Sequence, residues 1–149
     1  MSTVTSSPTP LATGVLDLID RSRGCLLEAC HQQDVIERYR CAQLAALRAA
    51  AALLAARSRR NARSGPRSVW EVVPTVAPEL AEWATYFTDT GRRGQIFDRG
   101  AQRPTVREAD DLIRAGETFL GLVLRCLGLP MASVLGAGLD AAVAPSMAR

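Results

Sequence analysis

The chain has 149 residues, which suits one domain with enough buried surface for a core that needs neither disulfides nor metal. Almost half of the residues (48%) are apolar, only 5% are aromatic and strand-like alternation is missing, so alanine and leucine in helices must form the core. The formal net charge is +3 and every basic residue is arginine, a balance that permits an anionic partner without requiring one.

Both ends of the chain are expected to lie outside the folded domain, which is assigned to residues 13–130. Residues 1–12 are polar, rich in Pro, Ser and Thr and unlike a signal peptide, and they predict a disordered tail. Residues 131–149 are rich in Ala and Gly and predict a flexible or weakly helical tail. No apolar run reaches the length of a membrane span, so a cytoplasmic protein without a membrane partner is expected. The cysteines form no CxxC and suit buried reduced thiols: Cys25, Cys30, Cys41 and Cys126.

The first two helices are predicted on either side of a short turn. One runs from about Val15 to Gln32, with Thr13 as its N-cap. The other runs from Val35 to Ala56 behind Asp34, which forms an Asp-x-x-Glu start related to the capping box. The apolar stripe of this second helix is predicted to contain Ile36, Leu44, Leu47, Ala51 and Leu54.

Two more helices are predicted in the second half of the chain. The third opens with a capping box at Ser68, is broken or kinked between Pro74 and Pro78, and ends near Phe87. Residues 88–104 contain three glycines and four arginines and predict a loop. The fourth opens with another capping box, at Thr105, and stops at Gly128 and Pro130. Amphipathic helices with short connections favour an all-α antiparallel bundle of four to five helices.

Catalytic and metal-binding patterns are missing from the sequence. His31 is the only histidine, and its neighbours resemble a helix end, where a histidine suits the helix dipole. Glu28 and His31 form one Glu-x-x-His spacing, whereas a di-metal bundle needs that motif twice. Nucleophile motifs and phosphate-binding glycine loops are also missing. The sequence therefore predicts no catalytic residue, no metal site and no cofactor.

Arginines are the candidate binding residues. Arg40 falls within the leucine stripe of the second helix, so it is expected either to be buried and paired with Glu82 or Glu117, or to bind an anion in a cleft. Two arginine-rich segments, residues 57–67 and 92–103, are expected at opposite ends of the bundle. Clustered arginines suit phosphate contacts, although charge runs are usually just solvated. The nucleic-acid-binding candidates are Arg57, Arg59, Arg60, Arg63, Arg67, Arg92 and Arg93.

Three regions of the sequence resemble helices of HEPN domains. Residues 37–50 resemble the second helix, residues 67–71 with 77–83 the third, and residues 107–112 with 117–120 the fourth. The more specific parts are Ser-Val-Trp-Glu from Ser68 and Arg-Glu-Ala-Asp-Asp from Arg107. Over residues 12–130 the chain is similar to an actinobacterial branch of this superfamily.

This resemblance implies a bundle of four or five helices, often a homodimer, that acts as an RNase or binds RNA or a nucleotide in defence and toxin–antitoxin systems. The RNase members carry Arg, four to six residues and then His late in the bundle. Here His31 lies on the first helix, and seven residues separate it from Arg23. A non-catalytic homodimer that binds RNA or a nucleotide is therefore expected. The alternatives are a regulatory module that binds another protein, and a degenerate RNase of toxin type that acts through His31 or Arg40.

Overall fold

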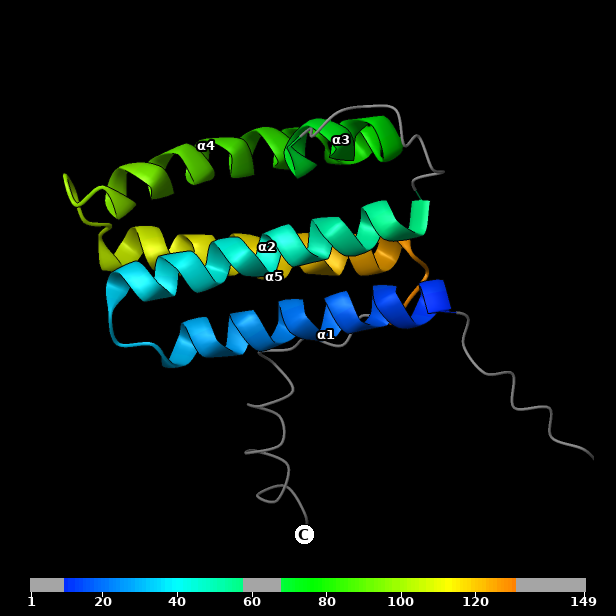
Figure 1. Cartoon of the computed structure of the whole chain (residues 1–149), viewed down its shortest axis with the longest axis horizontal. Coiled ribbons are helices and arrows are strands. Elements are labelled where there is room, and N and C mark those ends of the chain that lie inside the picture. The colour runs from blue at the N-terminus through cyan, green and yellow to red at the C-terminus, as the bar shows by residue number, and fades with distance from the viewer. Residues whose placement is uncertain (1–9, 58–67, 131–149) are drawn as a thin grey trace, which may run out of the picture.

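The computed structural model describes residues 10–57 and 68–130, and every regular element in these two ranges is a helix (Figure 1). The predicted all-α bundle of four to five helices is confirmed. The elements are α1 (Pro10–His31), α2 (Val35–Arg57), α3 (Val69–Val76), the 3₁₀ turn η1 (Pro78–Leu80), α4 (Ala81–Asp98) and α5 (Val106–Cys126).

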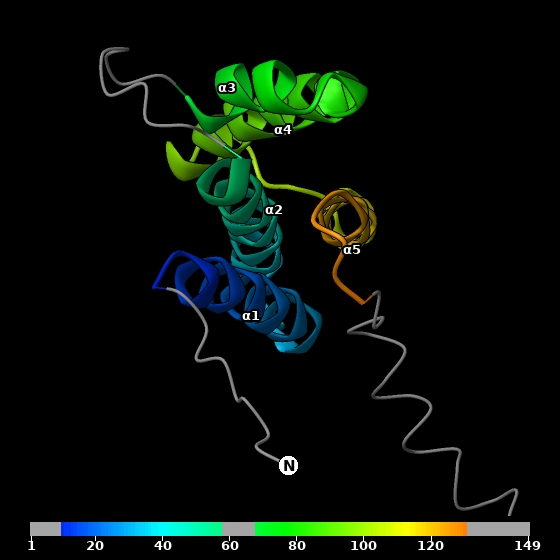
Figure 2. The ribbon, with the colours of Figure 1, turned by 90° about the vertical axis from the view of Figure 1, so that its right-hand side faces the viewer.

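Helix α2 occupies the centre of the bundle. Figure 1 shows α1 and α4 running in one direction and α2 and α5 in the other, with α1 and the α3–α4 layer on opposite sides of α2. The end-on view in Figure 2 places α5 beside α2, and α2 contacts each of the other four helices. A central helix must bury most of its circumference, so the buried face of α2 is wider than one apolar stripe.

Small residues bring α1 and α5 close to α2. The buried hydroxyl of Ser22 on α1 donates a hydrogen bond of 2.7 Å to the backbone carbonyl of Ala45 on α2. On the other side, a Cβ atom at Gly116 of α5 would lie 3.2 Å from a methyl group of Leu26 and 3.6 Å from the carbonyl oxygen of Ala42. Where helices pack this closely, only a hydrogen atom or a methyl group fits between them. Alanine is therefore the apolar residue that the core face of α2 can accommodate.

The leucine stripe predicted for α2 is wrong. Leu44 and Leu47 are each 38% exposed, whereas Leu53 and seven of the helix's other residues, most of them alanines, are buried. The error has a physical cause. The prediction assumed that α2 buries a single stripe made of its largest apolar residues, but α2 packs against close neighbours on several sides. The two leucines are left on the side that faces the α3–α4 layer.

Aromatic rings fill the space between the α3–α4 layer and α5. Phe87 of α4 is 2% exposed, and its ring centroid lies 5.1 Å from that of Phe119 on α5. Trp70 of α3 stacks on Phe87 at 4.8 Å with an interplanar angle of 22°, and Trp83 lies on it at 6.0 Å and 27°. Rings at these separations stabilise the fold beyond the area that they bury, so this aromatic cluster joins the α3–α4 layer to α5.

The predicted capping boxes differ in how fully they form. At α5 the hydroxyl of Thr105 accepts from the backbone N–H of Glu108 at 3.0 Å, and the Glu108 carboxylate accepts from the backbone N–H of Thr105 at 2.8 Å. At α3 the Ser68 hydroxyl accepts from the backbone N–H of Trp70 at 3.3 Å. Gly128, with φ of 68°, ends the α5 region as predicted, because the αL conformation that closes a helix favours glycine.

Two helix boundaries differ from the prediction. Helix α1 begins at Pro10, so Thr13 lies inside the helix instead of capping it, and residues 10–12 are not part of a tail. Helix α4 continues to Asp98 through most of the predicted loop at residues 88–104. Burial of Phe97, whose ring meets that of Tyr39 edge-on at 5.1 Å, holds this last part of α4 against α2. Residues 1–9 and 131–149, which make up the rest of the predicted tails, lie outside the described residues.

The burial of the cysteines differs from the prediction. All four thiols are free, but only Cys25 is buried: Cys41 and Cys126 are half-buried and Cys30 is exposed, against the expectation of buried thiols. Burial raises the pKa of the Cys25 thiol above its usual value. Among the helices of residues 10–57 and 68–130, none combines the length and the apolar character needed to cross a bilayer.

Candidate ligand-binding groove

A groove separates α2 from α3 and α4. It contains two adjoining cavities of about 250 and 420 Å³. We call it the α2–α4 groove and define it by the residues that line both cavities: Gln43, Leu47, Trp70, Phe87 and Gly91.

The wall of the groove on α2 is apolar in its middle. Leu44 lines the smaller cavity and Leu47 lines both, which accounts for the exposure of these two leucines. Opposite them lie Trp70 and Phe87, whose rings are stacked on each other. A concave apolar surface with an aromatic side chain and a few polar groups is the usual composition of a ligand site.

Two glycines of α4 determine the shape of the groove. A Cβ atom at Gly94 would lie 3.1 Å from the Gln43 side-chain oxygen and 3.4 Å from the Tyr39 ring, so α4 contacts α2 closely there. A Cβ atom at Gly91, one turn earlier, would meet no atom within 4 Å, so the space beside it is open. The two helices therefore touch at Gly94 and leave open space at Gly91, and the larger cavity continues along α4 to Gln95 and Asp98.

Tyr39 holds α2 and α4 together at this close contact. Its hydroxyl donates a hydrogen bond of 2.7 Å to the backbone carbonyl of Thr90 on α4, and its ring is buried. Burial is the main cause that raises the pKa of Tyr39 to about 12, so the hydroxyl keeps its proton and remains a donor at neutral pH.

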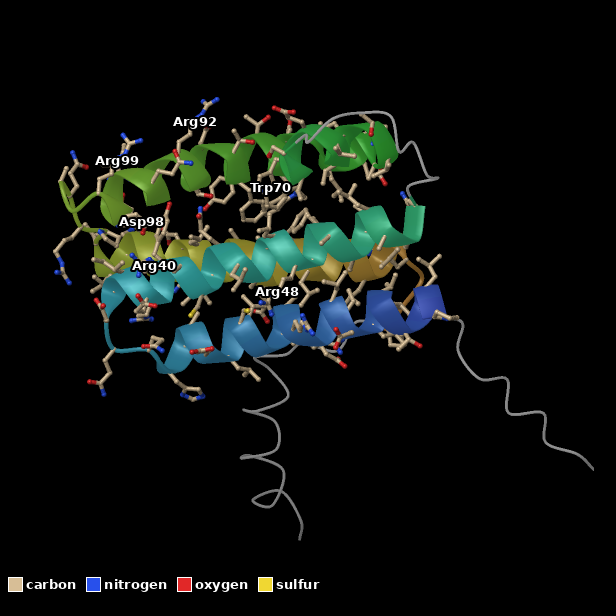
Figure 3. All side chains as sticks on the ribbon, viewed as in Figure 1. Arg40, Arg48, Trp70, Arg92, Asp98 and Arg99 are labelled. Carbon is tan, nitrogen blue, oxygen red and sulfur yellow. The ribbon has the colours of Figure 1, made fainter. Side chains whose placement is uncertain are left out.

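Arg40 lies at the mouth of the groove and is not buried. Its side chain is 51% exposed and forms ion pairs with Glu37 on its own helix and with Asp98 of α4, the latter at 2.8 Å. Figure 3 shows Arg40 and Asp98 pointing toward each other across the space between the two helices. The expected partners, Glu82 and Glu117, are not the ones that it uses. The expected ion pair with a carboxylate of another helix is therefore present, although its partner is Asp98 and the side chain is exposed instead of buried. Anion binding by Arg40 stays a prediction.

Arg92 and Arg93 have different surroundings. Arg92 lines the larger cavity, its side chain is 75% exposed, and its nearest carboxylate, that of Asp89, is 3.8 Å away. In Figure 3 it extends from α4 on the side away from α2. Arg93 is held by the Glu108 carboxylate and lies 5.1 Å from the centre of the Phe97 ring. Arg92 is thus available at the rim, whereas Arg93 joins α4 to α5.

Arg57, which the sequence assigns to a phosphate-binding cluster, connects helix ends. Its guanidinium donates to the carbonyl of Val76 at 3.2 Å and to that of Cys126 at 2.8 Å, the last residues of α3 and α5. Such carbonyls lack a partner within their own helix, and a positive charge suits this end of the helix dipole. The other candidates of this cluster lie outside the described residues: Arg59, Arg60, Arg63 and Arg67.

The single histidine does not line the groove. His31 is exposed at the end of α1, away from the groove residues, and the Glu28 carboxylate one turn before it accepts from the Gln32 amide at 3.4 Å. Over residues 10–57 and 68–130, no three metal-ligating side chains lie together.

The family model of SAV_6107-like HEPN domains matches residues 29–124. The chain belongs to this HEPN family. The matched span contains every residue of the α2–α4 groove. No curated protein and no solved structure matches the sequence significantly.

The sequence predictions found only part of this site. Arg40 was identified as a charge within an apolar stripe, Arg92 as part of an arginine-rich segment, and Trp70 as part of a helix start. Gln43, Gln95 and Gly91 were missed. The signal that would have found them is the pair Gly91 and Gly94, which fall on one side of a helix only if α4 extends beyond Phe87.

Proposed function

We propose that this HEPN protein is a non-catalytic module that binds RNA or a nucleotide through the α2–α4 groove. The observation that carries the proposal is the position of Trp70 in an open groove with an arginine at its rim. Proteins that bind single-stranded nucleic acids combine aromatic side chains, which stack on bases, with arginines that contact phosphates.

A groove without a histidine supports a role in binding. RNA cleavage needs a group that moves a proton at the reacting hydroxyl, and histidine is the usual carrier. His31, the only histidine in the sequence, lies on α1 and does not line the groove. A degenerate RNase acting through Arg40 is disfavoured, since two carboxylates already hold its guanidinium and its charge is permanent.

Pairing narrows the choice of phosphate-binding arginines. Among the described arginines, Arg38 is paired with Asp110, Arg93 with Glu108, and Arg57 with two helix ends. We therefore assign phosphate contacts to Arg92, and we retain the sequence prediction for the four arginines of residues 58–67. These four are Arg59, Arg60, Arg63 and Arg67. The segment that contains them is followed in the sequence by Ser68, which lines the groove.

Binding of labelled single-stranded RNA, followed by fluorescence anisotropy at increasing salt, tests this proposal. The wild-type protein should bind, and the logarithm of its affinity should fall with the logarithm of salt concentration by about 0.7 for each phosphate neutralised. Replacing Arg59, Arg60, Arg63 and Arg92 with Ala should weaken binding and flatten that dependence.

Arg114 supplies the matched control. Like Arg92 it is highly exposed, at 79%, and its nearest aspartate is 3.8 Å away at i,i+3 spacing, but it lies on α5 and does not line the groove. Arg114→Ala should bind as the wild type does. A wild-type protein that binds no RNA or nucleotide at low salt would contradict the proposal.

A protein-binding module is the second candidate, and the exposure of Leu44 and Leu47 favours it. Two leucines at i,i+3 spacing in a groove between helices suit an amphipathic helix of a partner. Replacing both with Ser would then release a copurifying protein without changing RNA affinity. We also propose that the chain forms a homodimer, on the resemblance to HEPN domains alone, and light scattering after gel filtration would test it.

A further inference from the structure

We infer that the α2–α4 groove accepts one unpaired nucleobase, so that the protein selects single-stranded over double-stranded RNA. This inference rests on the proposed function and specifies its ligand.

The shape of the groove suits a flat ring. The space is open beside Gly91, and it is bounded by Leu44 and Leu47 on α2 and by Trp70 on α3. Trp70 is held in position by its stack on Phe87, which is itself buried. A ring that enters this space therefore meets a preorganised aromatic and aliphatic surface instead of mobile side chains, which lowers the entropy cost of binding.

Two carboxamides provide polar contacts for the edge of such a ring. Gln43 projects from α2 and Gln95 from α4, and both line the larger cavity. Within the described residues, neither side chain has a hydrogen-bond partner. Each carboxamide offers donors and an acceptor, the combination that matches the edge of a nucleobase.

The positions of the charges place the phosphate outside the groove. Inside the mouth, Glu37 and Asp98 neutralise Arg40, so a phosphate there would face two carboxylates. Arg92 stands at the rim with its guanidinium turned away from α2 (Figure 3). The base would enter, while the backbone would remain at the rim. Bases of an A-form duplex are stacked and paired, so they cannot enter in this way.

Gly91→Leu tests the inference, because its side chain would fill the open space beside α4. Leucine favours a helix interior over glycine, so this variant should remain folded. Gly24→Leu is the matched control: it makes the same change inside α1, where a Cβ atom also meets nothing within 4 Å, but far from the groove. Both variants are compared with the wild type for binding a single-stranded oligoribonucleotide and a duplex of the same sequence.

The wild type and Gly24→Leu should bind the single strand roughly tenfold more tightly than the duplex, as expected when one base stacks on an aromatic side chain. Gly91→Leu should lose this preference and keep its affinity for the duplex. An unchanged preference in Gly91→Leu would overturn the inference, as would equal wild-type binding of both RNAs. If the wild type binds neither RNA and no nucleotide, the proposed function fails as well, so the two failures are distinguishable.

Tryptophan fluorescence provides a second readout. In Trp83→Phe the only remaining tryptophan is Trp70, whose emission should be quenched by the single strand and not by the duplex. In Trp70→Phe the emission of Trp83, which lines a different cavity beside Tyr86, should not respond. Quenching of Trp83 alone would place the base elsewhere and overturn the assignment.

Discussion

Replacing Arg57 with Ala should destabilise the fold more than it weakens RNA binding. The guanidinium donates to carbonyls of Val76 and Cys126, at the ends of α3 and α5, and hydrogen bonds from a charged group contribute about 1.5–3 kcal/mol each. Because 36% of the side chain is exposed, solvent screening reduces the expected total to about 2 kcal/mol. For a domain of this size that loss corresponds to a decrease in Tm of roughly 6–12 °C.

Thermal unfolding followed by circular dichroism measures this effect. Arg57→Lys keeps the charge but cannot reach both carbonyls with one planar group, so its Tm should fall between those of the wild type and Arg57→Ala. Arg114→Ala removes an exposed arginine that is 3.8 Å from its nearest carboxylate, and its Tm should not change. A Tm for Arg57→Ala within about 1 °C of the wild type would refute the role of Arg57 as a connection between helix ends.

Three further predictions concern the packing of α1, α4 and α5. Ser22→Ala removes the buried hydrogen bond to Ala45 and should lower the free energy of unfolding by about 1 kcal/mol, seen as a lower urea midpoint with an unchanged m value. Thr105→Ala removes the α5 cap and should lower the free energy of unfolding by about 1 kcal/mol in the same assay. An unchanged urea midpoint would mean that the capping box is dispensable. The raised pKa of Tyr39, about 12, favours its neutral form in the folded state, so its contribution to stability is complete below about pH 10 and is lost as the pH rises toward 12. Tyr39→Phe should make the urea midpoint less dependent on pH in that window, and an equally steep dependence would contradict the assignment.

Local signals in the sequence were sufficient to locate a helix end wherever that end depends only on neighbouring residues. The capping box at Thr105 and the stop at Gly128 were both found, because a cap is made by residues within a few positions of each other. The interruption of the third helix was also found, since Pro74 and Pro78 restrict the backbone whatever surrounds them.

The groove could not be found in this way, because it depends on contacts between distant residues. Glycines and arginines after Phe87 predicted a loop, whereas packing of Phe97 against Tyr39 continues α4 and aligns Gly91 with the groove. The exposure of Leu47 likewise follows from the central place of α2, which no periodicity of a single helix reveals. The partners of Arg57 lie 19 and 69 positions away in the chain, so its capping role was equally hidden.

Photo-crosslinking tests the central claim most directly. The wild-type protein would be irradiated with a single-stranded RNA that carries 4-thiouridine, digested, and analysed by mass spectrometry to locate the attached residue. The account predicts attachment to peptides that contain Trp70 of α3 or the part of α4 around Gly91, and loss of this attachment in Gly91→Leu but not in Gly24→Leu. Attachment confined to α1 or α5, away from the α2–α4 groove, would contradict it.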